Sequence, residues 1–327
     1  MTSTTTRLGL VADLGGTHAR LALADNGQLL TETVRVLKCA DYASFSEALQ
    51  SFLDEVAGFA AKDDPVAQAC LAVASPIADG PIAFTNNHWS FDPPLLASEM
   101  RWQQLEVIND FNAMALGCAA LDAVQRVQVF GGQEKAGAPK LVIGPGTGLG
   151  TSALVWGPGG WIALQCQGGH VDLPVVSDLD VQIHSLLRKA HGRISAERVI
   201  SGFGLVNLYR AHASLAGAEP RWTEAAQITA AAVEGSDPVC VSTLDHFCEL
   251  LGRVAGNAAL TTGSLGGVYL CGGILPRIEE FLRSSSFHAA MLDKGRMRSF
   301  LLDVPVYLVK EPLTGLIGAA RALAPPA

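Results

Sequence analysis

The sequence predicts an α/β protein of two domains with a ligand-binding cleft between them. The chain has 327 residues, which is more than a single domain usually holds. Two glycine-rich turns, Gly15-Gly16-Thr17 and Gly146-Thr147-Gly148, each join two short apolar runs. Three short strands and then helical patterns accompany each turn, so the second half repeats the plan of the first without repeating its sequence. Small ligands commonly bind in the cleft between two such halves.

Composition excludes several classes of partner. Hydrophobic residues make up 49% of the chain and charged residues 17%, with a formal net charge of -8. A nucleic acid or an anionic membrane surface would require a basic face, which this balance does not provide. No apolar run approaches the ~18 residues of a membrane span, and the run from Leu8 to Ala12 is too short for a signal peptide core. We expect a soluble, cytoplasmic protein that acts on a small polar substrate.

The cysteines indicate neither a disulfide framework nor a zinc site. Their number is odd, they are widely spread, and they form no Cys-x-x-Cys pair. Most lie in apolar surroundings, so we expect buried thiols. The seven are Cys39, Cys70, Cys118, Cys166, Cys240, Cys248 and Cys271.

The first third of the chain reads as a meander, a helix and further strands. Three strands are expected between Arg7 and Leu37, with the second turn at Asn26-Gly27, because Asn-Gly is a strong hairpin signal. Apolar residues then recur at helical spacing from Phe45 to Phe59. Strands are expected at residues 69–75 and 105–108, and a helix at 111–121 directly after the second.

The second half repeats this order. A three-strand meander is expected at residues 140–165, strands at 267–271 and 306–309, and helices at 245–260 and 313–323. Ser195 is expected to cap a further helix that starts at Ala196-Glu197. Gly252 and Gly256 lie on one face of the helix at 245–260, which would allow close packing.

Both glycine turns have the composition of a phosphate-binding hairpin. Glycines adopt backbone angles closed to other residues and bring N–H groups close to a ligand, while Asp13 could hold a water-bound Mg²⁺. Neither turn is a Walker or Rossmann motif, because a strand follows where those motifs need a helix. Each turn alone is equally consistent with a plain hairpin, but two turns with Gly-Thr at matching places favour phosphate binding.

Taken together, the motifs of this chain resemble those of bacterial glucokinases of the hexokinase type, within the actin-like ATPase superfamily. The cysteine-rich zinc motif of the repressor-related glucokinases is missing. The matching segments are Asp13–Thr17, Thr85-Asn86, Val107–Phe111, Gly146–Gly150, Gly168–Asp172, Ser195–Val199 and Cys271–Ile274. The resemblance implies a two-domain actin-like (ribonuclease H-like) fold with an active-site cleft between the domains, and a homodimer. We expect a small domain of residues 1–112 and 311–327 and a large domain of residues 113–310.

The resemblance also implies the reaction, which is transfer of the γ-phosphoryl group of ATP to the 6-hydroxyl of glucose with Mg²⁺, a step of glycolysis. Asp110 would take the proton from the sugar hydroxyl. Its place between a strand and a helix is equally explained if Asp110 merely caps the helix. The sugar would be held by Asn109, Gln167, His170 and Glu197. Without the resemblance, Asn109 fits a strand end, His170 a structural loop, and Glu197 the first turn of a helix.

The nucleotide residues follow from the same resemblance. One hairpin would bind the phosphates from one side and Gly146 and Thr147 from the other, while Gly272 and Gly273 let the backbone approach adenosine. Those two glycines are also explained by a tight turn before Pro276. The residues of the first hairpin are Ala12, Asp13, Leu14, Gly15, Gly16 and Thr17, with Asp13 holding Mg²⁺ through water.

Gln167 departs from the family pattern, which places a glutamate before Gly-Gly-His. An amide loses the charge of a carboxylate, and charged hydrogen bonds contribute ~1.5–3 kcal/mol against ~0.5–1.5 for neutral ones. Sugar affinity would therefore fall roughly ten-fold while turnover survives. We predict an active kinase with weak or altered sugar affinity. The alternatives are a kinase of another hexose, such as mannose or glucosamine, and a sugar or nucleotide sensor that has lost efficient turnover.

Overall fold

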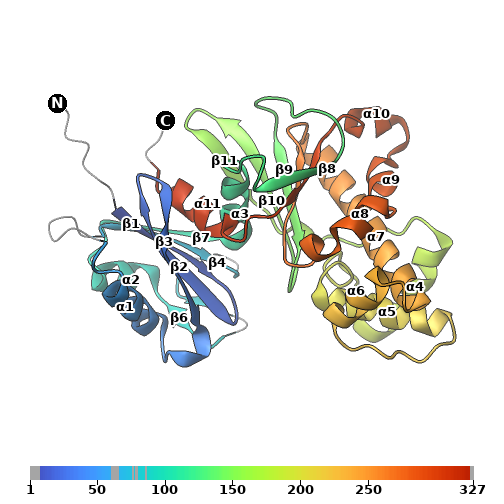
Figure 1. Cartoon of the computed structure of the whole chain (residues 1–327), viewed down its shortest axis with the longest axis horizontal. Coiled ribbons are helices and arrows are strands. Elements are labelled where there is room, and N and C mark those ends of the chain that lie inside the picture. The colour runs from blue at the N-terminus through green and yellow to red at the C-terminus, as the bar shows by residue number, and fades with distance from the viewer. Residues whose placement is uncertain (1–7, 60–65, 76, 78–79, 85–86, 325–327) are drawn as a thin grey trace. The chain divides into compact units, whose positions relative to one another are not determined.

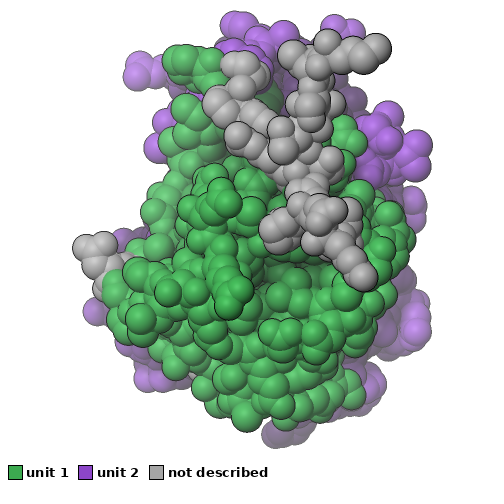
Figure 2. All heavy atoms as spheres, turned by 90° about the vertical axis from the view of Figure 1, so that its left-hand side faces the viewer, with its two compact units in different colours: residues 1–121, 157–165, 311–327 green, residues 122–156, 166–310 purple. Residues whose placement is uncertain are grey.

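The computed structural model describes residues 8–59, 66–75, 77, 80–84 and 87–324 (Figure 1). The motif residues Thr85 and Asn86 lie outside this set. Two compact units divide the chain, and Figure 2 colours them separately: unit 1 comprises residues 1–121, 157–165 and 311–327, and unit 2 comprises residues 122–156 and 166–310. Unit 1 extends beyond the expected boundary at residue 112, because the helix after that point packs against the C-terminal helix of the same unit.

Unit 1 contains a five-stranded sheet in the order β3-β2-β1-β4-β7. Strands β1, β4 and β7 run parallel, and β2 and β3 continue the sheet antiparallel from β1. Asn26 and Gly27 have φ values of 49° and 78°, which is the left-handed pair that an Asn-Gly hairpin requires. The strands are β1 (Leu8–Leu14), β2 (His18–Asp25), β3 (Gln28–Lys38), β4 (Gln68–Val73) and β7 (Gln104–Asn109).

Helices cover both faces of this sheet. One face forms a core with α1 (Phe45–Glu55) and α2 (Pro93–Glu99), and the other packs against α11 (Thr314–Ala322). Helix α11 also lies against α3 (Asp110–Cys118), where a Cβ added at Gly318 would lie only 1.6 Å from the carbonyl oxygen of Ala113. Helix α1 ends at Glu55, before the expected Phe59, because Val56 leaves helical geometry. Minor elements are η1 (Cys39–Asp41), β5 (Ile82–Ala83) and β6 (Ser90–Phe91).

Unit 2 repeats the strand order of unit 1, with β10-β9-β12-β13 in the places of β2-β1-β4-β7 and β8 added beyond β13. Strands β9, β12 and β13 are parallel, while β10 and β8 are antiparallel to their neighbours. The predicted duplication is therefore confirmed. The strands are β8 (Arg126–Phe130), β9 (Lys140–Pro145), β10 (Leu149–Gly157), β12 (Val268–Leu270) and β13 (Val306–Val309), and β11 (Gly160–Gln165) completes the predicted meander but is assigned to unit 1.

The main helix of unit 2 is α7 (Pro238–Thr262), which is longer than the predicted 245–260 because Asp237 caps it earlier. A Cβ at Gly252 would lie 2.1 Å from the carbonyl oxygen of Phe287 in α9, so the predicted small-residue face does allow close packing. The other elements are α4 (Asp178–His191), α5 (Gly202–Leu215), α6 (Ala225–Val233), α8 (Glu279–Ser284), α9 (Phe287–Leu292), α10 (Arg298–Leu301), η2 (Gly168–His170), η3 (Leu275–Ile278) and η4 (Gly295–Met297).

The helix predicted to start at Ser195 is wrong. Backbone N–H groups of this segment bond outside it: Ala196 donates to the carbonyl of Val171 at 2.9 Å and Glu197 to that of Gly169 at 2.8 Å. Residues 195–200 make only a turn, which ends because Ser201 takes an extended backbone with φ of -160° and ψ of 178°. The helix begins only at α5, where Ser201 is the cap.

All seven cysteines are free thiols, and six of them are buried, as expected. Cys166 is the partly exposed one. Among the described residues, no helix combines the length and the apolarity that a membrane crossing requires.

Candidate active site

The first glycine hairpin is held from outside its own strands. Gly15 N–H donates to the carbonyl of His18 at 3.1 Å, which closes the turn between β1 and β2. The carbonyl of Gly15 accepts from Asn87 Nδ2 at 3.2 Å, and the carbonyl of Thr17 accepts from the N–H of Cys39 at 3.0 Å. The loop shape is therefore fixed without a ligand. Sequence reasoning missed Asn87 and Cys39, because nothing in their local pattern indicates a contact with the hairpin.

Asp13 lies opposite Arg20 in the register of β1 and β2, and its Oδ2 accepts from Arg20 Nη1 at 3.1 Å. Burial raises the pKa of the Asp13 carboxyl, and the guanidinium offsets part of that effect. A Cβ at Gly315 would lie 3.4 Å from the Asp13 carboxyl carbon, so this glycine leaves space in front of the acid.

The described residues around Asp13 fit a weakly held magnesium ion, but they do not form a metal site made of several protein ligands. Within the described ranges, no group of three or more His, Cys, Asp or Glu side chains is placed to hold a metal. Magnesium usually takes one or two protein carboxylates and completes its shell with water and substrate phosphates. A single partly exposed carboxylate beside a glycine hairpin suits that mode of binding.

Asn109 and Asp110 lie where β7 passes directly into α3. Asn109, which is buried, is the helix cap, and its Oδ1 accepts from the N–H of Phe111 at 3.0 Å. Asp110 is the first helical residue, and its Oδ1 accepts from the same N–H at 2.9 Å. The capping role proposed for Asp110 as an alternative therefore belongs to Asn109, with Asp110 sharing the donor.

The electrostatic surroundings of Asp110 suit proton transfer. Burial is the largest cause that raises the pKa of Asp110 to about 6, and the nearby charge of Asp13 adds to it. Hydrogen bonds from the Phe111 N–H and from Asn109 act in the opposite direction. A carboxylate with a pKa close to the working pH is an efficient general base.

The second glycine hairpin is tied to the start of a helix. Gly146 N–H donates to the carbonyl of Gly148 at 2.8 Å, and the carbonyl of Gly146 accepts from the N–H of Gly202 at 2.8 Å. Gly202 is the first residue of α5, whose cap Ser201 accepts from Gly204 N–H at 3.0 Å. Helix N-termini favour anions, so the start of α5 would also favour a phosphate group bound at this hairpin. The cap signal at Ser201 could have revealed this helix from the sequence.

Glu197 connects the second hairpin to the Gly-Gly-His turn. Its Oε2 accepts from the N–H of Leu149 at 2.9 Å, and a Cβ at Gly148 would lie 2.4 Å from the same oxygen. Its Oε1 lies 3.9 Å from His170 Nδ1. No helix begins at Glu197, so the alternative role in a first helical turn is excluded.

The turn η2 is packed closely onto β10. Gly168 N–H donates to Thr151 Oγ1 at 2.8 Å, and a Cβ at Gly169 would lie 2.1 Å from the carbonyl oxygen of Leu149. Gln167 and His170, at the two ends of this turn, are exposed. The turn therefore exposes two polar side chains, while its glycine backbone lies too close to β10 for a larger residue at Gly169.

Gly272 and Gly273 follow β12 and precede η3. Gly272 has a φ of 90°, and a Cβ there would lie 2.3 Å from the carbonyl oxygen of Pro145 at the end of β9. This supports the alternative of a tight turn for Gly272. Gly273 is exposed, with open space where a side chain would stand, so a ligand role remains a prediction.

The predicted site residues thus form two groups, one in each unit. Unit 1 holds the first hairpin with Asn109 and Asp110, where the charges of Asp13 and Asp110 interact. Unit 2 holds the second hairpin, the turn with Gln167 and His170, Glu197, and the two glycines after β12.

Duplicated sheets, each with a glycine hairpin, and a buried carboxylate at a strand end fit a phosphotransferase of the actin-like α/β fold. Residues 10–325 match the family model described as Glucokinase. A glucokinase from Marinobacter nauticus is 49% identical over 314 residues, covering 96% of this chain and 96% of that protein. The chain belongs to the glucokinase family, and it is accordingly a hexose kinase.

Solved structures agree with this assignment. The crystal structure of a glucokinase from an Antarctic psychrotroph has a TM-score of 0.87 and 39% identity, over 97% of this chain and 98% of that one. The glucokinase of Balamuthia mandrillaris, solved in complex with glucose, has a TM-score of 0.75 and 23% identity over 98% of this chain and 94% of that one. The second likeness shows the same fold.

Proposed function

We propose that this chain transfers the γ-phosphoryl group of ATP to the 6-hydroxyl of glucose, with Asp110 as the general base. The position of Asp110 carries the proposal: it begins α3 directly after β7, in the same unit as the Asp13 hairpin and close enough for the two charges to interact, and burial raises its pKa to about 6. At neutral pH most of this carboxylate is ionised and accepts a proton, whereas an ordinary aspartate would be a much weaker base. The proton of the 6-hydroxyl passes to Asp110 as the hydroxyl oxygen attacks the γ-phosphorus.

Unit 2 supplies the groups that we propose hold the sugar. His170 and Glu197 lie close to each other, and Gln167 stands at the other end of the same turn. From unit 1, Asn109 adds an amide beside the base. Because Glu197 is anchored by the Leu149 N–H, its carboxylate is oriented before sugar arrives.

The glycine hairpins of both units are proposed to bind the phosphates of ATP, with Gly272 and Gly273 at adenosine. Backbone N–H groups in such turns favour anions, as does the start of α5. Asp13 would hold Mg²⁺ through water, and the ion would neutralise charge on the transferred group. Phosphoryl transfer depends mainly on positioning and charge neutralisation, and rigid loops serve both.

Replacing Asp110 tests the base directly. Removal of a general base typically costs ~10²–10⁴ in rate, so we expect kcat of Asp110→Ala to fall by about that factor while the KM for ATP changes little. Glucose-dependent ADP release in a coupled assay measures both. Asp122→Ala, which removes an exposed acid four residues after the end of α3, is the matched control and should keep full activity. A kcat within a few-fold of the unchanged chain would exclude Asp110 as the base.

Gln167 favours a second candidate, which is phosphorylation of another hexose at the same site. Its amide offers two donors and one acceptor where the related pattern has an anionic acceptor, so hydroxyl preferences would change. Steady-state kinetics across glucose, mannose and glucosamine distinguish the two. A cytoplasmic location, a place in glycolysis and a homodimer remain predictions from the family resemblance.

A further inference from the structure

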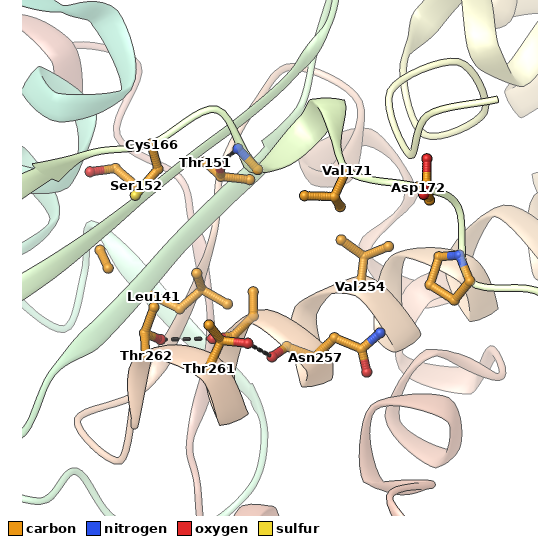
Figure 3. A pocket seen from close by; sticks show the side chains of 14 residues that line it. Leu141, Thr151, Ser152, Cys166, Val171, Asp172, Val254, Asn257, Thr261 and Thr262 are labelled. Carbon is orange, nitrogen blue, oxygen red and sulfur yellow. Dashed lines mark hydrogen bonds between the residues drawn. The ribbon is translucent and has the colours of Figure 1, made fainter. Parts of the chain in front are cut away.

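Unit 2 contains a pocket of about 250 Å³ that the proposed reaction does not use. It lies between β10, the segment after β11 and one face of α7, and we call it the α7 pocket (Figure 3). In Figure 3, Cys166, Thr151 and Val171 lie on the upper side of the pocket, and Val254, Asn257 and Thr261 of α7 lie on the lower side.

Most of the surface that lines the α7 pocket is apolar, although the lining also includes the hydroxyl residues Thr151, Ser152, Thr261 and Thr262. Leu141, Ala153 and Ala258 add to the two valines. The one charged residue in the lining is Asp172, whose side chain is 82% exposed and pairs with Arg193 at 2.7 Å, so its charge stays at the rim. An ion inside would lose hydration without gaining an opposite charge from the lining. The interior therefore favours an uncharged molecule.

The volume of the α7 pocket limits the class of ligand further. An apolar protein cavity of about 150 Å³ stays dry and binds benzene, and the α7 pocket is larger than that at about 250 Å³. Two fused rings fill such a space better than one. The exposed amide of Asn257 at the rim offers an acceptor to one N–H or O–H group.

The pocket shares its wall with the turn that carries His170. Thr151 lines the pocket, and its Oγ1 accepts from the N–H of Gly168, the first residue of η2. Val171 lines the pocket directly after the last residue of η2, and its carbonyl accepts from Ala196 N–H beside Glu197. Both ends of the turn therefore contact whatever fills the pocket.

We propose that the α7 pocket is a binding site for a small, neutral, two-ring aromatic molecule, and that its occupancy changes the affinity of the enzyme for sugar through η2. The second part rests on the proposed roles of His170 and Glu197. A ligand packed against Thr151 and Val171 restrains the backbone of η2, and binding that favours one arrangement of the turn must change sugar binding by the same factor in both directions.

Calorimetric titration with indole tests the site. We expect saturable binding to the full chain with a dissociation constant below about 1 mM. Ala258→Phe, which fills the pocket, should abolish binding, whereas Ala230→Phe on the exposed side of α6 should leave it unchanged. Indole should also slow alkylation of Cys166 by N-ethylmaleimide in the unaltered chain, located by peptide mass spectrometry, which does not depend on any variant folding. Absence of saturable binding, or equal binding by Ala258→Phe, would overturn the site.

Glucose titrations with and without indole test the coupling. We expect the dissociation constant of glucose to change by about fivefold or more when indole is present, and that of indole to change by the same factor when glucose is added. The KM for glucose should shift in the same direction with kcat nearly constant. Indole binding with glucose affinity unchanged would overturn the coupling. The calorimetry requires no turnover, so failure of Asp110 as the base would leave the binding result intact and the two proposals can fail separately.

Discussion

The two units are built on one strand order but make different uses of it. In each, a glycine hairpin joins the first two strands of the meander. In unit 1 the hairpin follows a carboxylate, Asp13, that points at a guanidinium in the next strand. In unit 2 the hairpin is contacted by the carboxylate of Glu197, which comes from a turn far along the chain and accepts from the backbone N–H of Leu149. In unit 1 the carboxylate thus belongs to the strand that leads into the hairpin. In unit 2 the carboxylate comes from elsewhere in the chain and holds the hairpin backbone in place.

The ends of the last parallel strands differ in the same way. Strand β7 ends in Asn109 and leads to Asp110, whose pKa is raised to about 6. Strand β13 leads to Lys310, which pairs with Glu279. Hydrogen bonds from Lys310 and Arg283 lower the pKa of the Glu279 carboxyl. The carboxylate of Asp110 after β7 therefore has little positive charge to balance it. The carboxylate of Glu279, at the corresponding end of β13, is balanced by Lys310 and Arg283. The two units therefore share one strand order and differ in how charge is placed at the ends of these strands.

The largest effect we expect concerns close helix packing, which both units share. Gly318→Ala would place a Cβ 1.6 Å from the carbonyl of Ala113, and Gly252→Ala one 2.1 Å from that of Phe287. Backbone atoms yield little, so Gly318→Ala should lower the free energy of unfolding by about 3 kcal/mol and Gly252→Ala by less. Urea unfolding measures both. Gly58→Ala, in open space, is the control, and equal stability of Gly318→Ala and that control would contradict the packing argument.

The variant Asp110→Asn tests whether the charge of Asp110, unlike that of Glu279, costs stability. Because the folded pKa of Asp110 is raised above its ordinary 3.8, ionisation costs stability as pH rises through about 6, and that cost is absent below pH 4. The variant should therefore be more stable than the unaltered chain by about 2 kcal/mol at pH 8 and equally stable at pH 4, while losing activity. Urea midpoints at the two pH values test this. The same gain at both values would mean that charge burial is not the cause.

Much of this fold could be predicted because local patterns and tertiary structure agree. The Asn26-Gly27 hairpin, the meander turns and the strand before Asp110 are each specified by neighbouring residues. The helix predicted from Ser195 was wrong because a second cap candidate follows closely: Ser201 takes the extended cap conformation, which ends the turn at residues 195–200 and starts α5. A local signal does not say which of two nearby cap residues the folded chain uses.

The ligand roles of the predicted site residues stay predictions, but the structure adds contacts around them that the sequence did not indicate. The resemblance named the carboxylates and glycines, but it could not give the capping role of Asn109 or the support of Gly15 by Asn87. Asn87 lies 72 residues from Gly15 in sequence, and its amide has no periodic or motif context. The pKa of Asp110 likewise depends on burial by the rest of unit 1, which no local pattern encodes.

A smaller effect distinguishes the sugar side of unit 2. Gln167→Glu should tighten glucose binding roughly ten-fold, because a charged acceptor replaces a neutral one. The KM for ATP should stay unchanged. Gln165→Glu, also exposed and two residues earlier, adds the same charge outside the turn and should have no effect. Glucose titration by calorimetry decides, and unchanged affinity would show that the amide is not the limiting contact.

The smallest effect concerns Arg20, the partner of the unit 1 carboxylate. Without this guanidinium, burial of Asp13 is less compensated and the pKa of Asp13 rises further. Asp13 must be ionised to hold a magnesium hydrate, so the acid limb of kcat/KM for MgATP should move to higher pH in Arg20→Gln. Arg35→Gln removes a similar ion pair with Glu55 elsewhere in unit 1 and should leave the profile in place. If both variants keep the same acid limb, Asp13 does not control nucleotide use, and the chemical contrast between the two hairpins is lost.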